Sequence, residues 1–133
     1  MEKLTWNDSL SVGVDEVDND HKHLVGLLND LIQCIDDEKG NDEIEVVLDE
    51  LLSYTSWHFR HEERLMQTYD YESFEDHKSE HTALIEQAVG LQEKFKTEGE
   101  GITPEVLDFL KDWLTSHILG TDSVMGRFLQ SEM

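Results

Sequence analysis

The chain has 133 residues, with 31 acidic side chains against 10 basic ones and a formal net charge of −21. This length suits one domain, and we expect a single domain over residues 1–133. Such a charge repels phosphate backbones and anionic lipid, so no nucleic-acid or membrane partner is expected. Neither a long apolar run nor an apolar N-terminal segment is present, and Cys34 is the one cysteine. These features together favour the cytoplasm.

The first helix is expected over about residues 17–37, after an N-terminal arm of residues 1–16. Its inward positions alternate in steps of four and three, which is the spacing of a bundle helix. They are Val17, His21, Leu24, Leu28, Leu31 and Ile35.

A second helix is expected over about 42–68, because Gly40 stops the first and the same alternation resumes at Ile44. Its inward positions are Ile44, Leu48, Leu51, Thr55, His58, Glu62, Leu65 and Tyr69. A third helix over about 73–97 has the inward positions Phe74, His77, His81, Leu84, Ala88, Leu91 and Phe95.

The fourth helix is expected over about 104–129, because Gly99 and Gly101 interrupt the chain and Thr103 then precedes Pro104 in the favoured cap-then-proline order. Four helices joined by short loops predict an all-α fold, an antiparallel up-down-up-down four-helix bundle.

Five of the seven histidines fall on the inward stripes, whereas His23 and His61 do not and are expected at the surface or its boundary. In an up-down-up-down bundle, the starts of helices one and three and the ends of helices two and four share one end. The inward histidines and one glutamate should therefore meet in one layer. They are His21, His58, Glu62, His77, His81 and His117.

Five imidazoles and a carboxylate are too many ligands for one ion with an open position, and they suit two metal ions. A second bridging carboxylate is then expected, and Asp122 is the candidate. A regular helix leaves Asp122 about 140° away from His117. A local widening of the helix near Gly120 could turn it inward, so spacing alone leaves Asp122 open.

Other readings of these residues are weaker. Metal-free core histidines would leave a costly polar core. A ferritin-like di-iron oxidase requires Glu-x-x-His on two helices, and no glutamate lies three residues before any of these histidines. A zinc hydrolase of the zincin type requires a second histidine where Leu65 stands.

The chain resembles the hemerythrin family, and most of all its bacterial single-domain members, over nearly its whole length. The resemblance rests on Trp6, on Gly13 and Val14, and on four segments: 20–24 (DHKHL), 58–66 (HFRHEERLM), 77–81 (HKSEH) and 113–122 (WLTSHILGTD). One departure is Asp20, where glutamine is frequent in the bacterial members. It touches the edge of the site, and no altered function is inferred from it.

The resemblance implies two non-haem iron ions, one bound by His77, His81 and His117 and the other by His21 and His58. Glu62 and Asp122 would bridge them together with an oxo or hydroxo group, and dioxygen would bind at the open position of the second iron. It further implies an apolar oxygen pocket lined by Leu24, Phe59, Trp113, Leu114 and Ile118.

The expected function is therefore reversible dioxygen binding by a carrier, store or delivery protein that is not an enzyme. Two alternatives stay open: an oxygen- or redox-sensing module of a signalling protein, and a di-iron enzyme that handles peroxide or nitric oxide. The oligomeric state is not determined by the sequence, although the charge favours a monomer.

Overall fold

The computed structural model describes residues 3–98 and 104–133, and within these ranges the regular structure is helical throughout. The helices are α1 (Asp15–Asp36), α2 (Asn41–Thr68), α3 (Phe74–Glu98), α4 (Pro104–His117) and α5 (Ser123–Glu132). The interruption expected at Gly99 and Gly101, and the cap expected at Thr103, lie outside the described residues.

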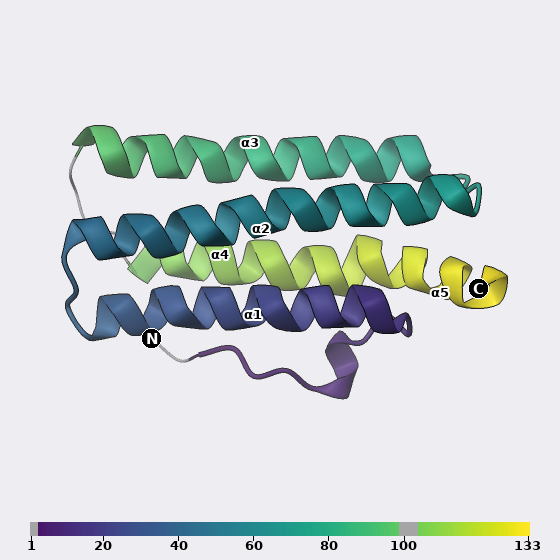
Figure 1. Ribbon diagram of the computed structural model, residues 1–133, viewed down its shortest axis with the longest axis horizontal. Coiled ribbons are helices and arrows are strands. Elements are labelled where there is room, and N and C mark those ends of the chain that lie inside the picture. Colours follow the sequence, from purple (N-terminus) through teal and green to yellow (C-terminus); the bar gives the residue numbers. More distant parts are fainter. Residues whose placement is uncertain (1–2, 99–103) are drawn as a thin grey trace.

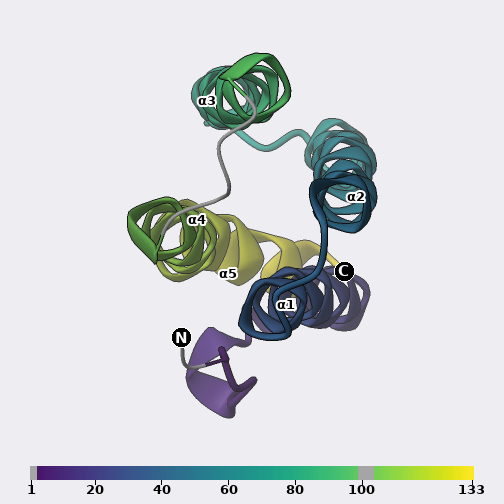
Figure 2. The ribbon, with the colours of Figure 1, turned by 90° about the vertical axis from the view of Figure 1, so that its left-hand side faces the viewer.

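The helices form an antiparallel bundle in which α4 and α5 together make the fourth rod (Figure 1). In the end-on view α2 lies between α1 and α3, and the arm lies on the outer side of α1 (Figure 2). The start of α1, the end of α2, the start of α3 and the end of α4 lie toward the same end of the bundle (Figure 1). The predicted up-down-up-down four-helix fold is confirmed.

The core follows the predicted inward stripes. Leu24, Leu28 and Leu31 of α1 and Leu48 and Leu51 of α2 are all at most 3 % exposed. Burying a leucine side chain stabilises a fold by about 1.5–3 kcal/mol, so these stripes hold the helices together. The same stripes then continue into polar residues toward the end where the histidines lie.

The N-terminal arm is fixed to the bundle by Asp18 in the first turn of α1. The Asp18 carboxylate accepts hydrogen bonds from the Ser11 hydroxyl at 2.6 Å and from the Val12 backbone N–H at 2.8 Å.

Gly13 has a φ of 80°, a left-handed conformation that favours glycine. Helix α1 begins at Asp15, two residues before the predicted start.

The fourth rod, predicted as a helix over about 104–129, is divided by a change of helix type. A π-helical turn, Ile118–Asp122, separates α4 from α5, and α5 continues to Glu132. This turn is the local widening that the sequence raised as the condition for an inward Asp122. An added residue per turn changes which side chains face the core beyond it.

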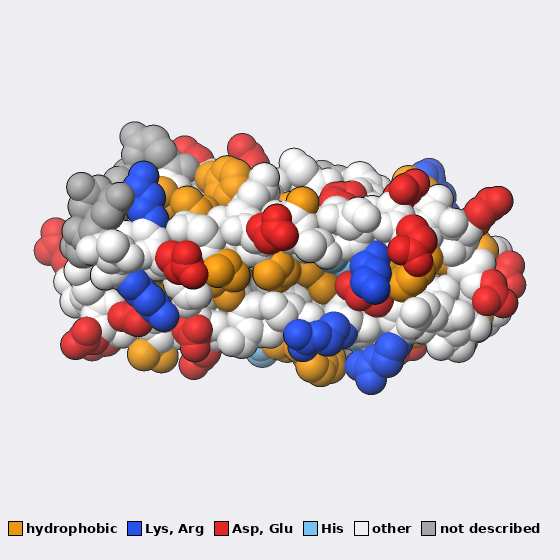
Figure 3. Space-filling view, turned by 90° about the horizontal axis from the view of Figure 1, so that it is seen from above, with side chains coloured by type: hydrophobic (Ala, Val, Ile, Leu, Met, Phe, Trp, Pro, Cys, Tyr) orange, Lys and Arg blue, Asp and Glu red, His pale blue; other side chains and the backbone are white. Residues whose placement is uncertain are grey.

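The surface carries the acidic excess. On the face in Figure 3, acidic side chains are scattered along the length of the molecule and do not form one patch. No helix within the described ranges has both the length and the apolar character needed to span a membrane.

Candidate metal centre

Seven polar side chains converge inside the bundle. Each is at most 5 % exposed, although histidine and carboxylate side chains normally stay in contact with water. They are His21, His58, Glu62, His77, His81, His117 and Asp122, the same seven residues that the sequence nominated as metal ligands.

The helices deliver these side chains for simple reasons of spacing. His58 and Glu62 lie four residues apart on α2, and His77 and His81 lie four apart on α3, so each pair projects from one face. The π-helical turn directly after His117 carries Asp122 inward, where its Oδ1 lies 2.9 Å from His117 Nε2.

The Glu62 carboxylate presents one oxygen to each of two histidine groups. Glu62 Oε2 faces His58 Nε2 at 3.1 Å and His21 Nε2 at 3.4 Å. The other oxygen, Oε1, faces His81 Nε2 at 3.0 Å and His77 Nε2 at 3.4 Å.

Asp122 divides its oxygens in the same way. Its Oδ2 lies 2.9 Å from His21 Nε2, and its Oδ1 lies 3.0 Å from His77 Nε2. The cluster therefore consists of two groups that share both carboxylates. One contains His77, His81 and His117, and the other contains His21 and His58.

The ring nitrogens and carboxylate oxygens of the centre are oriented as ligands. The Nε2 atoms of His21, His58, His77 and His117, and both oxygens of Asp122, are buried without a hydrogen-bond partner. The Nε2 atoms of His21, His58 and His77 nevertheless lie 2.9–3.4 Å from carboxylate oxygens of Glu62 and Asp122. Two ligands at right angles around an ion, with bonds of about 2.1 Å, lie about 3.0 Å apart. The residues present therefore fit a pair of metal ions.

The electrostatics of the centre show how strongly the two carboxylates act on the imidazoles. Burial lowers the pKa of His58, but the charge of Glu62 and the contact with Asp20 outweigh it and raise that pKa to about 10. Burial likewise lowers the pKa of His77, and contacts with Asp122 and Glu62 raise it to about 9. Buried negative charge of this kind requires cations, which can be protons or metal ions.

A second layer of carboxylates contacts the outer nitrogens of three histidines. His58 Nδ1 donates to Asp20 of α1 at 2.8 Å, and His81 Nδ1 donates to Glu63 of α2 at 2.9 Å. His117 Nδ1 donates to Glu80 of α3 at 2.8 Å. Helices α1, α2 and α3 thus each supply a carboxylate to a histidine of the next helix in the chain. These contacts direct each Nε2 toward the centre.

Sequence reasoning missed Glu63 and Glu80 and placed Asp20 only at the edge of the site. A usable signal existed, because each of the three directly adjoins a proposed ligand on its own helix. A residue next to an inward position lies about 100° around the helix, where it can reach the neighbouring helix. His23 is exposed and His61 lies at the boundary, both as expected. His61 also contacts Asp20, which the sequence did not predict.

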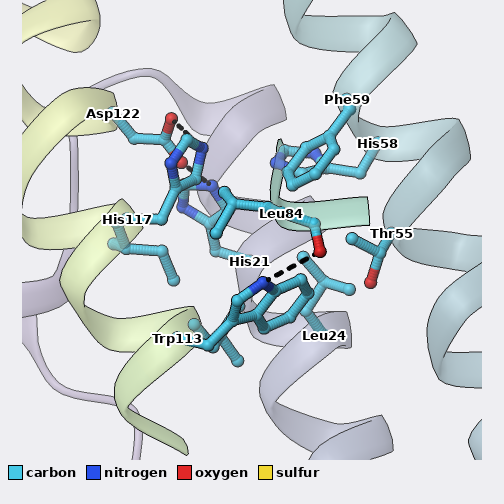
Figure 4. A pocket seen from close by; sticks show the side chains of 11 residues that line it. His21, Leu24, Thr55, His58, Phe59, Leu84, Trp113, His117 and Asp122 are labelled. Carbon is cyan, nitrogen blue, oxygen red and sulfur yellow. Dashed lines mark hydrogen bonds and ion pairs between the residues drawn. The ribbon is translucent and has the colours of Figure 1, made fainter. Parts of the chain in front are cut away.

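An apolar cavity of about 10 Å³ adjoins the centre (Figure 4). Its walls include all five side chains expected around a gas pocket: Leu24, Phe59, Trp113, Leu114 and Ile118. The histidines in its lining are His21, His58 and His117, so it opens mainly toward the two-histidine group. The pocket expectation omitted Leu84 and Thr55, which also line the cavity.

Both polar groups in the cavity wall outside the centre are already engaged. The Trp113 indole N–H donates to the Leu84 carbonyl at 3.3 Å (Figure 4), and the Thr55 hydroxyl donates to the Leu51 carbonyl at 2.6 Å. The cavity therefore presents hydrocarbon surface to whatever enters it.

Comparison with known proteins agrees with this geometry. Residues 12–129 match the family described as the Hemerythrin HHE cation binding domain. The chain is 33 % identical to a bacteriohemerythrin of Stenotrophomonas maltophilia over 92 % of its length and 78 % of that protein. It is 32 % identical to a bacteriohemerythrin of Methylococcus capsulatus, over 98 % of its length and all of that protein.

A solved structure described as wild-type hemerythrin superposes with a TM-score of 0.86 at 32 % identity, covering 96 % of this chain and 98 % of that one. The match extends through the helices that carry the buried centre. This chain belongs to the hemerythrin family.

Proposed function

We propose that this protein binds dioxygen reversibly at two non-haem iron ions. His77, His81 and His117 would hold one ion, His21 and His58 would hold the other, and Glu62 and Asp122 would be shared between them. Imidazole nitrogen and carboxylate oxygen suit iron among several first-row metals. Membership of the hemerythrin family, a cation-binding family, supports iron as the metal. When bound, the two ions supply the electrons for dioxygen binding.

The observation that carries this proposal is the position of the cavity. The group of His21 and His58 has one imidazole fewer than the group of His77, His81 and His117. This smaller group faces the apolar cavity. An incomplete ligand set next to a space is the arrangement expected for an ion that takes up an external molecule.

The size and polarity of the cavity favour a diatomic gas. A volume of about 10 Å³ is roughly the smallest that holds one water molecule, so it has no room for an organic substrate. Leu24, Phe59 and Ile118 provide apolar walls, which disfavour water and admit an apolar gas.

The same lining supports a binding protein over an enzyme. Apart from the proposed ligands, its described residues include no acid or base that could transfer a proton to a substrate. We therefore place this protein among oxygen carriers, stores or delivery proteins.

The test is a visible absorption spectrum of the iron-loaded protein, reduced without oxygen, then exposed to air, then purged with argon. We expect a band that appears with oxygen and fades on purging. Irreversible passage to a ferric spectrum without that band would contradict reversible binding. It would favour redox sensing or catalysis at the same centre.

A further inference from the structure

Asp20 differs from the other outer carboxylates because one of its oxygens serves two imidazoles. His58 Nδ1 lies 2.8 Å from Asp20 Oδ2, and His61 Nδ1 lies 2.5 Å from the same atom. The Tyr54 hydroxyl donates more weakly to Oδ1 at 3.4 Å. Glu63 and Glu80 each accept from a single imidazole.

The contact with Asp20 determines which nitrogen of His58 is available as a metal ligand. An imidazole whose Nδ1–H is bonded to a carboxylate presents its Nε2 as the ligand atom. The Nε2 atom of His58 lies 3.1 Å from Glu62 Oε2, within the two-histidine group beside the cavity. Asp20 therefore acts on the ion proposed to take up dioxygen.

Asp20 is also the most buried of the three outer carboxylates. The side chain of Asp20 is 8 % exposed, against 20 % for Glu63 and 38 % for Glu80. A charge-assisted hydrogen bond gains strength where water is excluded. Asp20 is thus the outer carboxylate whose contact with a ligand is best shielded from water.

His61 shares that carboxylate and connects it to the surface. Its Nε2 lies 3.2 Å from Glu16 Oε2, on a side chain that is half-exposed. A carboxylate oxygen that accepts from two donors binds each less strongly than it would bind one alone. The second donor therefore limits how much electron density Asp20 can pass to His58.

We propose that Asp20 is a positioning residue for the ion held by His21 and His58, and that His61 moderates its effect. The pair would set how strongly His58 binds that ion and hence the reduction potential of the centre. This inference rests on the proposed function, since it requires a redox-active metal at the centre.

The test compares D20N and H61F with the unaltered protein. D20N removes the charge and retains the shape, and H61F leaves His58 as the remaining imidazole donor to Asp20. D18N is the matched control, because Asp18 is also a buried carboxylate on α1. Its hydrogen bonds go to Ser11 and Val12 of the arm. The measurements are the midpoint potential of the two-iron protein and the His58 Nδ1–H resonance of the zinc-loaded protein.

We expect D20N to raise the midpoint potential, because His58 then donates less electron density to the iron and stabilises its ferric state less. The His58 Nδ1–H resonance should shift upfield, because its hydrogen bond becomes weaker. Affinity for the second ferrous ion should fall roughly 10- to 100-fold. H61F should lower the potential below that of the unaltered protein, and D18N should leave it unchanged.

The opposite signs separate this role from simple disruption of the fold, which would move D20N and H61F in the same direction. Shifts of equal sign, or potentials unchanged in both variants, would overturn the inference. If the unaltered protein fails to bind two irons or to bind dioxygen, the proposed function is wrong instead.

Discussion

His117 lies where the two layers of the centre meet. Its Nε2 is 2.9 Å from Asp122, and its Nδ1 donates to Glu80. Replacing it with alanine removes a proposed ligand and leaves both carboxylates without that partner. We expect H117A to contain fewer than two irons per chain, measured by elemental analysis.

His23 provides the control, because it is exposed and packs at a tilt against Tyr54, with 4.2 Å between ring centroids. H23A should keep both irons and the visible spectrum. Retention of both irons in H117A would refute the ligand assignment.

Leu24 tests the cavity independently of the metal. It is 1 % exposed and lines the cavity, so a phenylalanine there would fill the space that the gas needs. We expect L24F to bind both irons but to lose most of its oxygen-dependent absorption.

L28F is matched to it, because Leu28 is equally buried one turn further along α1 and lies outside the cavity lining. Both variants should lose about 1–3 kcal/mol of stability through overpacking. L28F should nevertheless keep the oxygen-dependent band. If both variants keep it, the cavity is not the binding site.

At the scale of elements, the contact between α5 and the arm depends on Gly126. A Cβ atom there would lie 2.2 Å from the Val12 carbonyl oxygen, which belongs to the backbone and cannot rotate away. We expect G126A to lower the free energy of unfolding by about 1–3 kcal/mol, measured by urea denaturation.

Gly26 is the comparison, because it lies within α1 with nothing within 4 Å of an added Cβ. G26A should raise the free energy of unfolding by about 0.5–1 kcal/mol, since alanine favours a helix over glycine. Equal effects of the two substitutions would show that the arm does not pack closely on α5.

At the scale of the whole molecule, the metal-free protein should be most stable in mildly acidic solution. Folding raises the pKa of His58 from 6.5 to about 10 and that of His77 to about 9. The protonated imidazoles of His58 and His77 therefore add to the free energy of unfolding. This contribution is fully present below pH 6.5 and is lost as the pH rises through 9 and 10.

The two bridging carboxylates act in the opposite direction. Folding lowers the pKa of Glu62 below 4.5 and that of Asp122 below 3.8, so their contribution is lost as the pH falls through these lowered values. Thermal unfolding of chelator-treated protein should therefore give the highest Tm between about pH 4.5 and 6.5. A Tm that rises steadily from pH 6.5 to 10 would contradict this picture.

Metal loading should reverse the alkaline loss, because metal ions replace the protons on His58 and His77. The Tm difference between loaded and metal-free protein should accordingly grow from pH 6.5 to 9. The two curves are measured on the same preparation before and after chelation.

The sequence by itself determined the four-helix bundle and the meeting of its polar residues. Alternating steps of four and three fix which side of each helix is buried, and up-down topology fixes which ends meet. His21, His58 and His77 could therefore be placed together without coordinates, since both rules depend only on local spacing and chain order.

Only the tertiary structure decided the helical turn that carries Asp122 inward, the outer carboxylates and the full lining of the cavity. Asp122 faces inward through a π-helical turn. Residue spacing could name this possibility but not choose it, and only the family resemblance implied Asp122 as a ligand beforehand. Asp20 reaches His58, and Leu84 joins the cavity wall, across gaps between helices. Such contacts depend on helix rotation and separation of an ångström or two, which residue spacing along one helix does not specify.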